Sequence, residues 1–84
     1  MKKITVYTTP ECGQCNLTMN WLTTRTIPFE TVDLSESPDD LAAVRELGYS
    51  SAPVVIVSNG DAADRHWFGF RPDFLHRYTV GAAA

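Results

Sequence analysis

The sequence predicts an α/β protein with a four-stranded mixed sheet flanked by three helices. Short β-branched and apolar runs alternate with segments that carry helix-start signals, in the order β-α-β-α-β-β-α. A helix between the first two strands predicts a parallel pair with a right-handed crossover, whereas a short turn joins the last two as an antiparallel hairpin. The chain of 84 residues suits one domain over residues 1–80, with a frayed tail over residues 81–84.

The first half of the chain begins with a strand, a helix and a second strand. Residues 3–8 are β-branched and aromatic, which is typical of a strand. Residues 17–26 form a helical segment that can begin near Gly13. It must stop before Pro28, because the residue before a proline avoids helical backbone. Residues 29–33 form the short second strand.

The second helix begins in residues 37–40, Ser-Pro-Asp-Asp. The serine can cap the helix, the proline suits the first helical position, and the aspartates favour the positive end of the helix dipole. Leu41, Val44 and Leu47 mark one face, and Gly48 ends the helix.

The second half of the chain supplies a hairpin and a third helix. Residues 54–57 are a continuous run of valine and isoleucine, typical of a strand buried on both faces. An Asn-Gly turn over residues 58–61 leads to a fourth strand over residues 65–68. Pro72-Asp73 starts the last helix, whose expected inward residues are Phe74, Leu75 and Tyr78.

Composition and charge disfavour several function classes. The net charge is −3 and there is no basic run, so neither nucleic acid nor an anionic membrane surface is expected as a partner. The apolar runs are too short to span a bilayer, and the first residues carry no secretion signal, which predicts a cytoplasmic location. Cytosolic thiols are kept reduced, so two cysteines there indicate a catalytic or metal-binding pair.

Cys12 and Cys15 form a Cys-Gly-Gln-Cys motif where a proline-containing loop meets a predicted helix. The first N–H groups of a helix lack internal partners and its dipole is positive there, so both features favour a thiolate. A stabilisation of about 2 kcal/mol would lower a thiol pKa from ~8.5 to near ~7. A thiol of that acidity is close to the optimum for attacking a disulfide at neutral pH.

The two cysteines are expected to play different roles. Cys12 lies at the exposed loop edge, so we expect it to attack a partner disulfide and form a mixed disulfide. Cys15 lies one helical turn further in and is expected to be shielded. Residues three apart share a helix face, so Cys15 can attack the Cys12 sulfur and release the reduced partner.

Three other interpretations of the cysteine pair compete with a catalytic role. A zinc site would need His66 and His76 as well, and the nine residues between them exceed the usual three to five. An inert buried pair conflicts with the polar neighbours Gln14 and Asn16. An iron–sulfur cluster bound by Cys12 across a dimer stays open, although one chain supplies too few thiolates for the usual four. No metal ligands are therefore assigned.

Three segments, taken together and in order, resemble the thioredoxin/glutaredoxin superfamily over nearly the whole chain. They are residues 6–15, which contain the cysteine motif, residues 51–55, Ser-Ala-Pro-Val-Val, and residues 67–73, Trp-Phe-Gly-Phe-Arg-Pro-Asp. The third resembles the Trp-Ser-Gly-Phe-Arg-Pro-Asp signature of NrdH-redoxins, and Gln14 fits that family's Cys-Val-Gln-Cys or Cys-Met-Gln-Cys pattern. The resemblance implies a thioredoxin fold.

The resemblance also implies a dithiol electron carrier. In NrdH-redoxins the cysteine pair reduces class Ib ribonucleotide reductase, and thioredoxin reductase recharges the pair from NADPH with no cofactor bound to the redoxin. Glutathione-type glutaredoxins usually carry a lysine before the first cysteine and an acidic pair after the glycine loop, whereas this chain has Thr9 and Pro72-Asp73. We therefore expect weak recognition of glutathione. The alternatives are a glutathione-dependent glutaredoxin, a metal- or cluster-binding module, and an idle adaptor; a monomer is expected.

Further site residues follow from the resemblance. Pro53 corresponds to the cis-proline that faces the cysteines, where it and the Ala52 backbone would shape a groove for an extended partner peptide. An ordinary proline at a strand start is the alternative. We also expect residues 67–71 to form a partner-docking loop, whose candidate residues are Trp67, Gly69, Phe70 and Arg71. The alternative is that the aromatic residues only pack the fourth strand and the last helix, and that Arg71 is an ordinary solvated side chain.

Two positions depart from the NrdH-redoxin pattern. Gly13 replaces the usual apolar residue between the cysteines and loosens the turn. Gly13 and Gln14 are therefore expected to adjust the redox properties of the cysteine motif. Phe68 replaces a serine and removes a hydroxyl from the family's hydrogen-bond network around the loop. Strand alternation puts Trp67 and Phe68 on opposite faces, so at least one is core and Phe70 is the better docking candidate.

Overall fold

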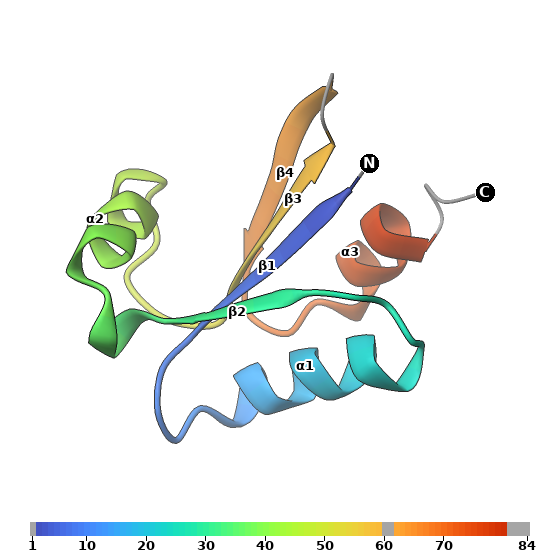
Figure 1. Cartoon of the computed structure of the whole chain (residues 1–84), viewed down its shortest axis with the longest axis horizontal. Coiled ribbons are helices and arrows are strands. Elements are labelled where there is room, and N and C mark those ends of the chain that lie inside the picture. The colour runs from blue at the N-terminus through green and yellow to red at the C-terminus, as the bar shows by residue number, and fades with distance from the viewer. Residues whose placement is uncertain (1, 60–61, 81–84) are drawn as a thin grey trace.

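The computed structural model describes residues 2–59 and 62–80 (Figure 1). Its four strands are β1 (Lys3–Thr8), β2 (Glu30–Asp33), β3 (Val54–Asn59) and β4 (Ala62–Phe68). Its α-helices are α1 (Gly13–Thr24), α2 (Pro38–Glu46) and the short α3 (Pro72–Leu75). A 3₁₀ turn η1 (Leu34–Glu36) precedes α2, and a π-helical turn η2 (His76–Val80) continues α3. The element order confirms the prediction, with η1 and η2 as additions.

The strands form one mixed sheet in the order β2-β1-β3-β4. β1 and β2 are parallel, whereas β3 is antiparallel to both β1 and β4. The predicted parallel first pair and antiparallel hairpin are therefore confirmed. Gly60 and Asp61 of the predicted hairpin turn lie outside the described residues, as does the predicted tail over residues 81–84.

Helices cover both faces of the sheet, with α1 and α3 on one side and α2 on the other (Figure 1). Two hydrophobic clusters match these layers, because Leu22 of α1 and Leu75 of α3 belong to the first and Val44 of α2 to the second. β3 contributes Val55 to the first cluster and Val54 to the second. The prediction of a strand buried on both faces is confirmed.

Two details of α2 differ from expectation. Leu47 is 41% exposed, although it was predicted on the inner face. The helix ends at Glu46, and the chain turns away through Gly48, whose φ is +99°. Ser37 occupies the N-cap position, but its hydroxyl donates to the Asp40 carboxylate and accepts no backbone N–H. The neighbouring carboxylate is the stronger partner for that hydroxyl.

Candidate active site

The cysteine motif lies where the backbone enters α1. Cys12 is the N-cap residue, with extended φ and ψ of −105° and 106°. Its Sγ accepts a hydrogen bond from the Cys15 N–H at 3.1 Å, and its carbonyl accepts from the Asn16 N–H at 3.2 Å. The sulfur therefore takes the place that a serine or aspartate oxygen usually occupies at a helix start. The helix begins at Gly13, the earlier of the two predicted starts.

The two cysteines are joined as a disulfide and differ in exposure. Their Cα atoms are 5.2 Å apart, within the usual range for a disulfide. Cys15 is 1% exposed, whereas Cys12 is only partly buried. An incoming group can therefore reach Cys12 from solvent more easily than it can reach Cys15. Beside them, the buried Thr18 hydroxyl donates to the Gln14 carbonyl at 2.9 Å and closes the first turn.

The Ala52–Pro53 peptide bond is cis, as the resemblance implied. Pro53 is buried, and its carbonyl accepts a hydrogen bond from the Gly69 N–H at 2.9 Å. Gly69 is itself buried and has a φ of +89°, a conformation that favours glycine. The loop after β4 is thus attached to the cis-proline segment through its glycine.

The next residue attaches the same loop to the cysteine motif. The Phe70 N–H donates to Gln14 Oε1 at 3.0 Å. A Cβ atom placed on Gly69 would lie 3.3 Å from that oxygen, so the side chain of Gln14 lies closely over the loop. Two consecutive N–H groups therefore join the cis-proline segment, the loop and the cysteine motif, which are the three segments that the sequence singled out.

Arg71 and Asp73 form an exposed ion pair at the start of α3. Arg71 Nε donates to Asp73 Oδ1 at 3.1 Å, and its terminal nitrogen donates to Oδ2 at 2.9 Å. The Arg71 guanidinium also lies 4.1 Å from the centre of the Phe74 ring. Hydrogen bonding from Arg71, followed by a weaker contribution from the Phe74 N–H, lowers the pKa of Asp73 below its ordinary value of 3.8. Arg71 is therefore already engaged within the loop.

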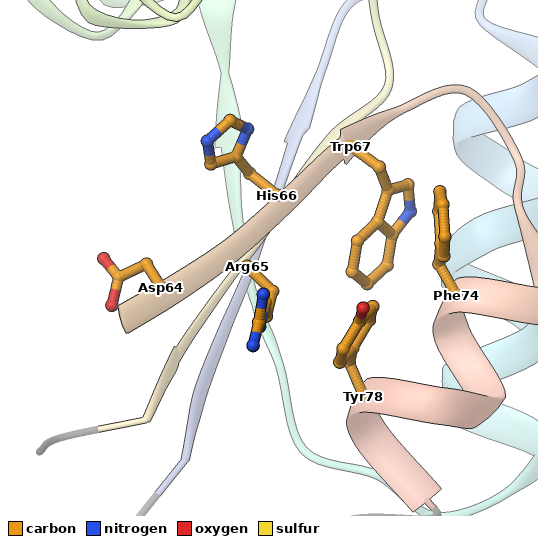
Figure 2. Close-up of a pocket in the computed structure, with 6 residues that line it drawn as sticks. All are labelled: Asp64, Arg65, His66, Trp67, Phe74 and Tyr78. Carbon is orange, nitrogen blue, oxygen red and sulfur yellow. The ribbon is translucent and has the colours of Figure 1, made fainter. Parts of the chain in front are cut away.

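Trp67 was predicted in the docking loop, and the structure corrects this. Its side chain is 3% exposed and lies in a group of aromatic rings on the α3 side of β4 (Figure 2). The ring centres of Phe74 and Tyr78 are 5.6 and 5.9 Å away. A side chain enclosed by these rings cannot contact a partner. The exposed member of the pair is Phe68, at 44%, which alternation could not identify.

The cavity beside Trp67 is separate from the cysteine motif. Its volume is about 220 Å³. Figure 2 shows the six lining residues, which are Asp64, Arg65, His66, Trp67, Phe74 and Tyr78. The indole Nε1 of Trp67 is buried and has no hydrogen-bond partner among the described residues. None of the lining residues belongs to the motif, so this cavity is not part of the cysteine site.

Within residues 2–59 and 62–80, no group of three or more histidine, cysteine, aspartate or glutamate side chains is arranged to hold a metal ion. No helix in those ranges combines the length and apolar character needed to cross a membrane.

Comparison with known proteins identifies the family. The Glutaredoxin family model matches residues 4–62. The glutaredoxin-like protein NrdH of Escherichia coli (strain K12) is 37% identical over 75 residues, covering 89% of this chain and 86% of that protein. The NrdH protein of Lactococcus lactis subsp. lactis (strain IL1403) is 33% identical over 72 residues, covering 86% of this chain and 93% of its own.

Solved structures agree with the sequence comparison. The structure of NrdH-redoxin from Escherichia coli superimposes with a TM-score of 0.79 at 37% identity, covering 89% of this chain and 92% of that one. The thioredoxin-like protein BC3987, at 23% identity and a TM-score of 0.75, supports the fold alone. The chain therefore belongs to the NrdH glutaredoxin-like proteins of the glutaredoxin family, which are thiol–disulfide oxidoreductases with a thioredoxin fold, and Cys12 and Cys15 are its redox pair.

Proposed function

We propose that this protein carries electrons to disulfides in protein clients, with class Ib ribonucleotide reductase as its main client. Thioredoxin reductase would restore the dithiol with electrons from NADPH. The hydrogen bond from the Cys15 N–H to Cys12 Sγ carries the proposal. The N–H groups of the first helical turn stabilise negative charge on the sulfur, so Cys12 is favoured as the thiolate after reduction.

The proposed reaction has two exchange steps. Cys12 thiolate attacks one sulfur of the client disulfide, and the other client sulfur leaves as a thiolate that takes up a proton. Cys15 then loses its proton and attacks Cys12 Sγ, which releases the second client thiolate. The client gains two electrons, and the redoxin ends as the Cys12–Cys15 disulfide present in the structure. Reduction by thioredoxin reductase reverses the redoxin's part of this exchange.

The surroundings of the pair suggest how a client binds. We assign the Ala52 backbone and cis-Pro53 to a groove that pairs with an extended client segment. Gly69 and Phe70 form the side of that groove. The Gly69 N–H binds the Pro53 carbonyl, and the Phe70 N–H binds Gln14 of the cysteine motif. Gly13 is exposed, so it leaves the approach to Cys12 open. Arg71 would hold this loop in shape through its bonds to Asp73.

Two features favour thioredoxin reductase over glutathione as the electron donor. Thr9 stands where glutathione-type glutaredoxins usually have a lysine, so one charge partner for glutathione is missing at that position. Arg71 donates two hydrogen bonds to the Asp73 carboxylate and so competes for it with the amino group of glutathione. We also propose a cytoplasmic location, where NADPH-dependent reductases maintain thiols.

An NADPH-coupled assay tests the donor and the client together. Reduction of class Ib ribonucleotide reductase should be fast with thioredoxin reductase and at least tenfold slower with glutathione and glutathione reductase. Equal rates with both donors would favour the glutathione-dependent alternative.

Trapping tests the assigned roles of the cysteines. Cys15→Ser should accumulate a mixed disulfide between Cys12 and the client, and Cys12→Ser should form none. If Cys15→Ser stays unmodified while the wild-type protein turns over, Cys12 is not the attacking residue. If the Cys12→Ser protein still supports the activity of ribonucleotide reductase, the protein acts as an adaptor.

A further inference from the structure

Phe68 presents an aromatic ring to solvent on the α2 side of the sheet. It is 44% exposed, and its ring stacks on Tyr49 with centres 6.5 Å apart and planes at 25°. Tyr49 is held in turn, because its hydroxyl shares a hydrogen bond of 2.9 Å with His66 Nδ1 and its N–H donates to the Val44 carbonyl. The two rings therefore form one continuous aromatic surface, positioned through Tyr49.

This surface lies next to the cis-proline segment. Phe68 pairs with Val54 across the β3–β4 ladder, and Val54 directly follows Pro53. A recess of about 130 Å³ adjoins the rings, and its lining residues are Gly48, Tyr49, Ser50, Ser51 and Phe68. Ser51 leads directly into Ala52. The recess is thus continuous with the segment that we assign to client binding.

The aromatic part of the recess favours an apolar occupant. Its lining residues contain two aromatic rings, two serines and a glycine, with no charged side chain. Covering an exposed aromatic ring with an apolar side chain is favourable, whereas bringing a charged side chain there removes water without supplying an ionic partner. The hydrogen bond from Tyr49 to His66 already positions one of the rings, so less conformational entropy is lost when a side chain packs on it.

We infer that Tyr49 and Phe68 form a specificity subsite that receives an apolar side chain next to the client cysteine. The inference rests on the proposed function and adds a substrate class to it, namely extended client segments with leucine, methionine or phenylalanine beside the cysteine. A serine at position 68, as in the NrdH-redoxin signature, would leave Tyr49 without its stacked partner.

Two disulfide-containing peptides test the subsite. They are identical except for one residue beside the attacked cysteine, which is leucine in one and aspartate in the other. The readout is the ratio of kcat/KM for the leucine peptide to that for the aspartate peptide, because lost folding or thiol reactivity lowers both values alike. The wild-type ratio should be roughly tenfold, as expected for burial of one apolar side chain.

Three variants make the test specific. Phe68→Ser should reduce the ratio to about twofold, whereas Phe68→Leu should keep most of it because the surface stays apolar. Leu17→Ser, which removes another exposed apolar side chain, should keep the wild-type ratio. A wild-type ratio near one, or an unchanged ratio in folded Phe68→Ser, overturns the inference. Both of those outcomes leave the proposed function standing if the peptides are reduced in a Cys12-dependent way; failure to reduce either peptide contradicts both.

Discussion

The N–H of Phe70 donates to Gln14 Oε1 at 3.0 Å, across 56 positions of sequence. Gln14 lies between the two redox cysteines, and Phe70 lies in the loop after β4. The preceding Gly69 N–H bonds the cis-proline carbonyl. One short loop therefore holds two functional segments in a fixed relation, which gives its residues a positioning role beside any contact with a client.

Removing the oxygen of Gln14 should loosen this loop. Gln14→Ala deletes the acceptor of the Phe70 N–H, and we expect faster hydrogen exchange at that amide and a free energy of unfolding lower by about 0.5–1.5 kcal/mol. Gln14→Glu keeps an oxygen at the same reach and should retain the protection. Amide exchange measured by NMR checks both variants; equal protection of Phe70 in Gln14→Ala would show that the bond is not formed in solution.

Gly69 and Gly13 offer a matched pair of glycine substitutions. Gly69→Ala places a Cβ at a φ of +89° and 3.3 Å from Gln14 Oε1, so the free energy of unfolding should fall by about 1–2 kcal/mol. Gly13→Ala meets no atom within 4 Å and lies in α1, so it should leave stability unchanged or raise it by up to about 1 kcal/mol. Urea denaturation measures both. A neutral Gly69→Ala would contradict the close fit of the loop.

The Arg71–Asp73 pair predicts that the free energy of unfolding depends slightly on pH in the acidic range. The pKa of Asp73 is lowered in the folded protein, mainly by its hydrogen bonds from Arg71. A carboxyl group whose pKa is lowered on folding stabilises the folded protein at pH values above its pKa in the unfolded chain. This stabilisation is lost as the pH falls through its pKa in the folded protein. The pH range in which this stabilisation is lost is therefore expected below 3.8, the ordinary pKa of the carboxyl group.

An NMR titration of the Asp73 carboxyl checks the cause of this shift. The folded midpoint should lie below 3.8 in the wild-type protein and rise toward it in Arg71→Gln. Arg77→Gln, which changes another exposed arginine beside α3, serves as the control and should leave the midpoint unchanged. The effect on stability should be slight and weaken with added salt, because the pair is exposed.

The exposure of the two cysteines predicts ordered alkylation. In the reduced protein, iodoacetamide should modify Cys12 first, since Cys15 is 1% exposed. The rate at Cys12 should reach half its maximum at a pH below ~8.5, the value for an unperturbed thiol. Peptide mapping by mass spectrometry assigns the modified residue. Faster modification of Cys15, or half-maximal reaction well above ~8.5, would mean that the helix start does not activate Cys12.

The sequence by itself determined the structural features that depend on residues close together in the chain. The strand and helix order, the helix start at the cysteine motif and the burial of β3 on both faces all follow from local patterns, and the structure confirms them. The resemblance added the cis bond before Pro53. These features are predictable because periodicity, capping and chain stiffness act over a few residues.

Only the tertiary structure decided which face of each element meets the core. Alternation separated Trp67 from Phe68, but their burial depends on where α2, α3 and Tyr49 lie against the sheet. The bond from Phe70 to Gln14 likewise joins residues that no local pattern connects. A side chain's exposure and its distant partners follow from packing of the whole chain, because the apolar area buried and the hydrogen bonds formed across elements select one arrangement.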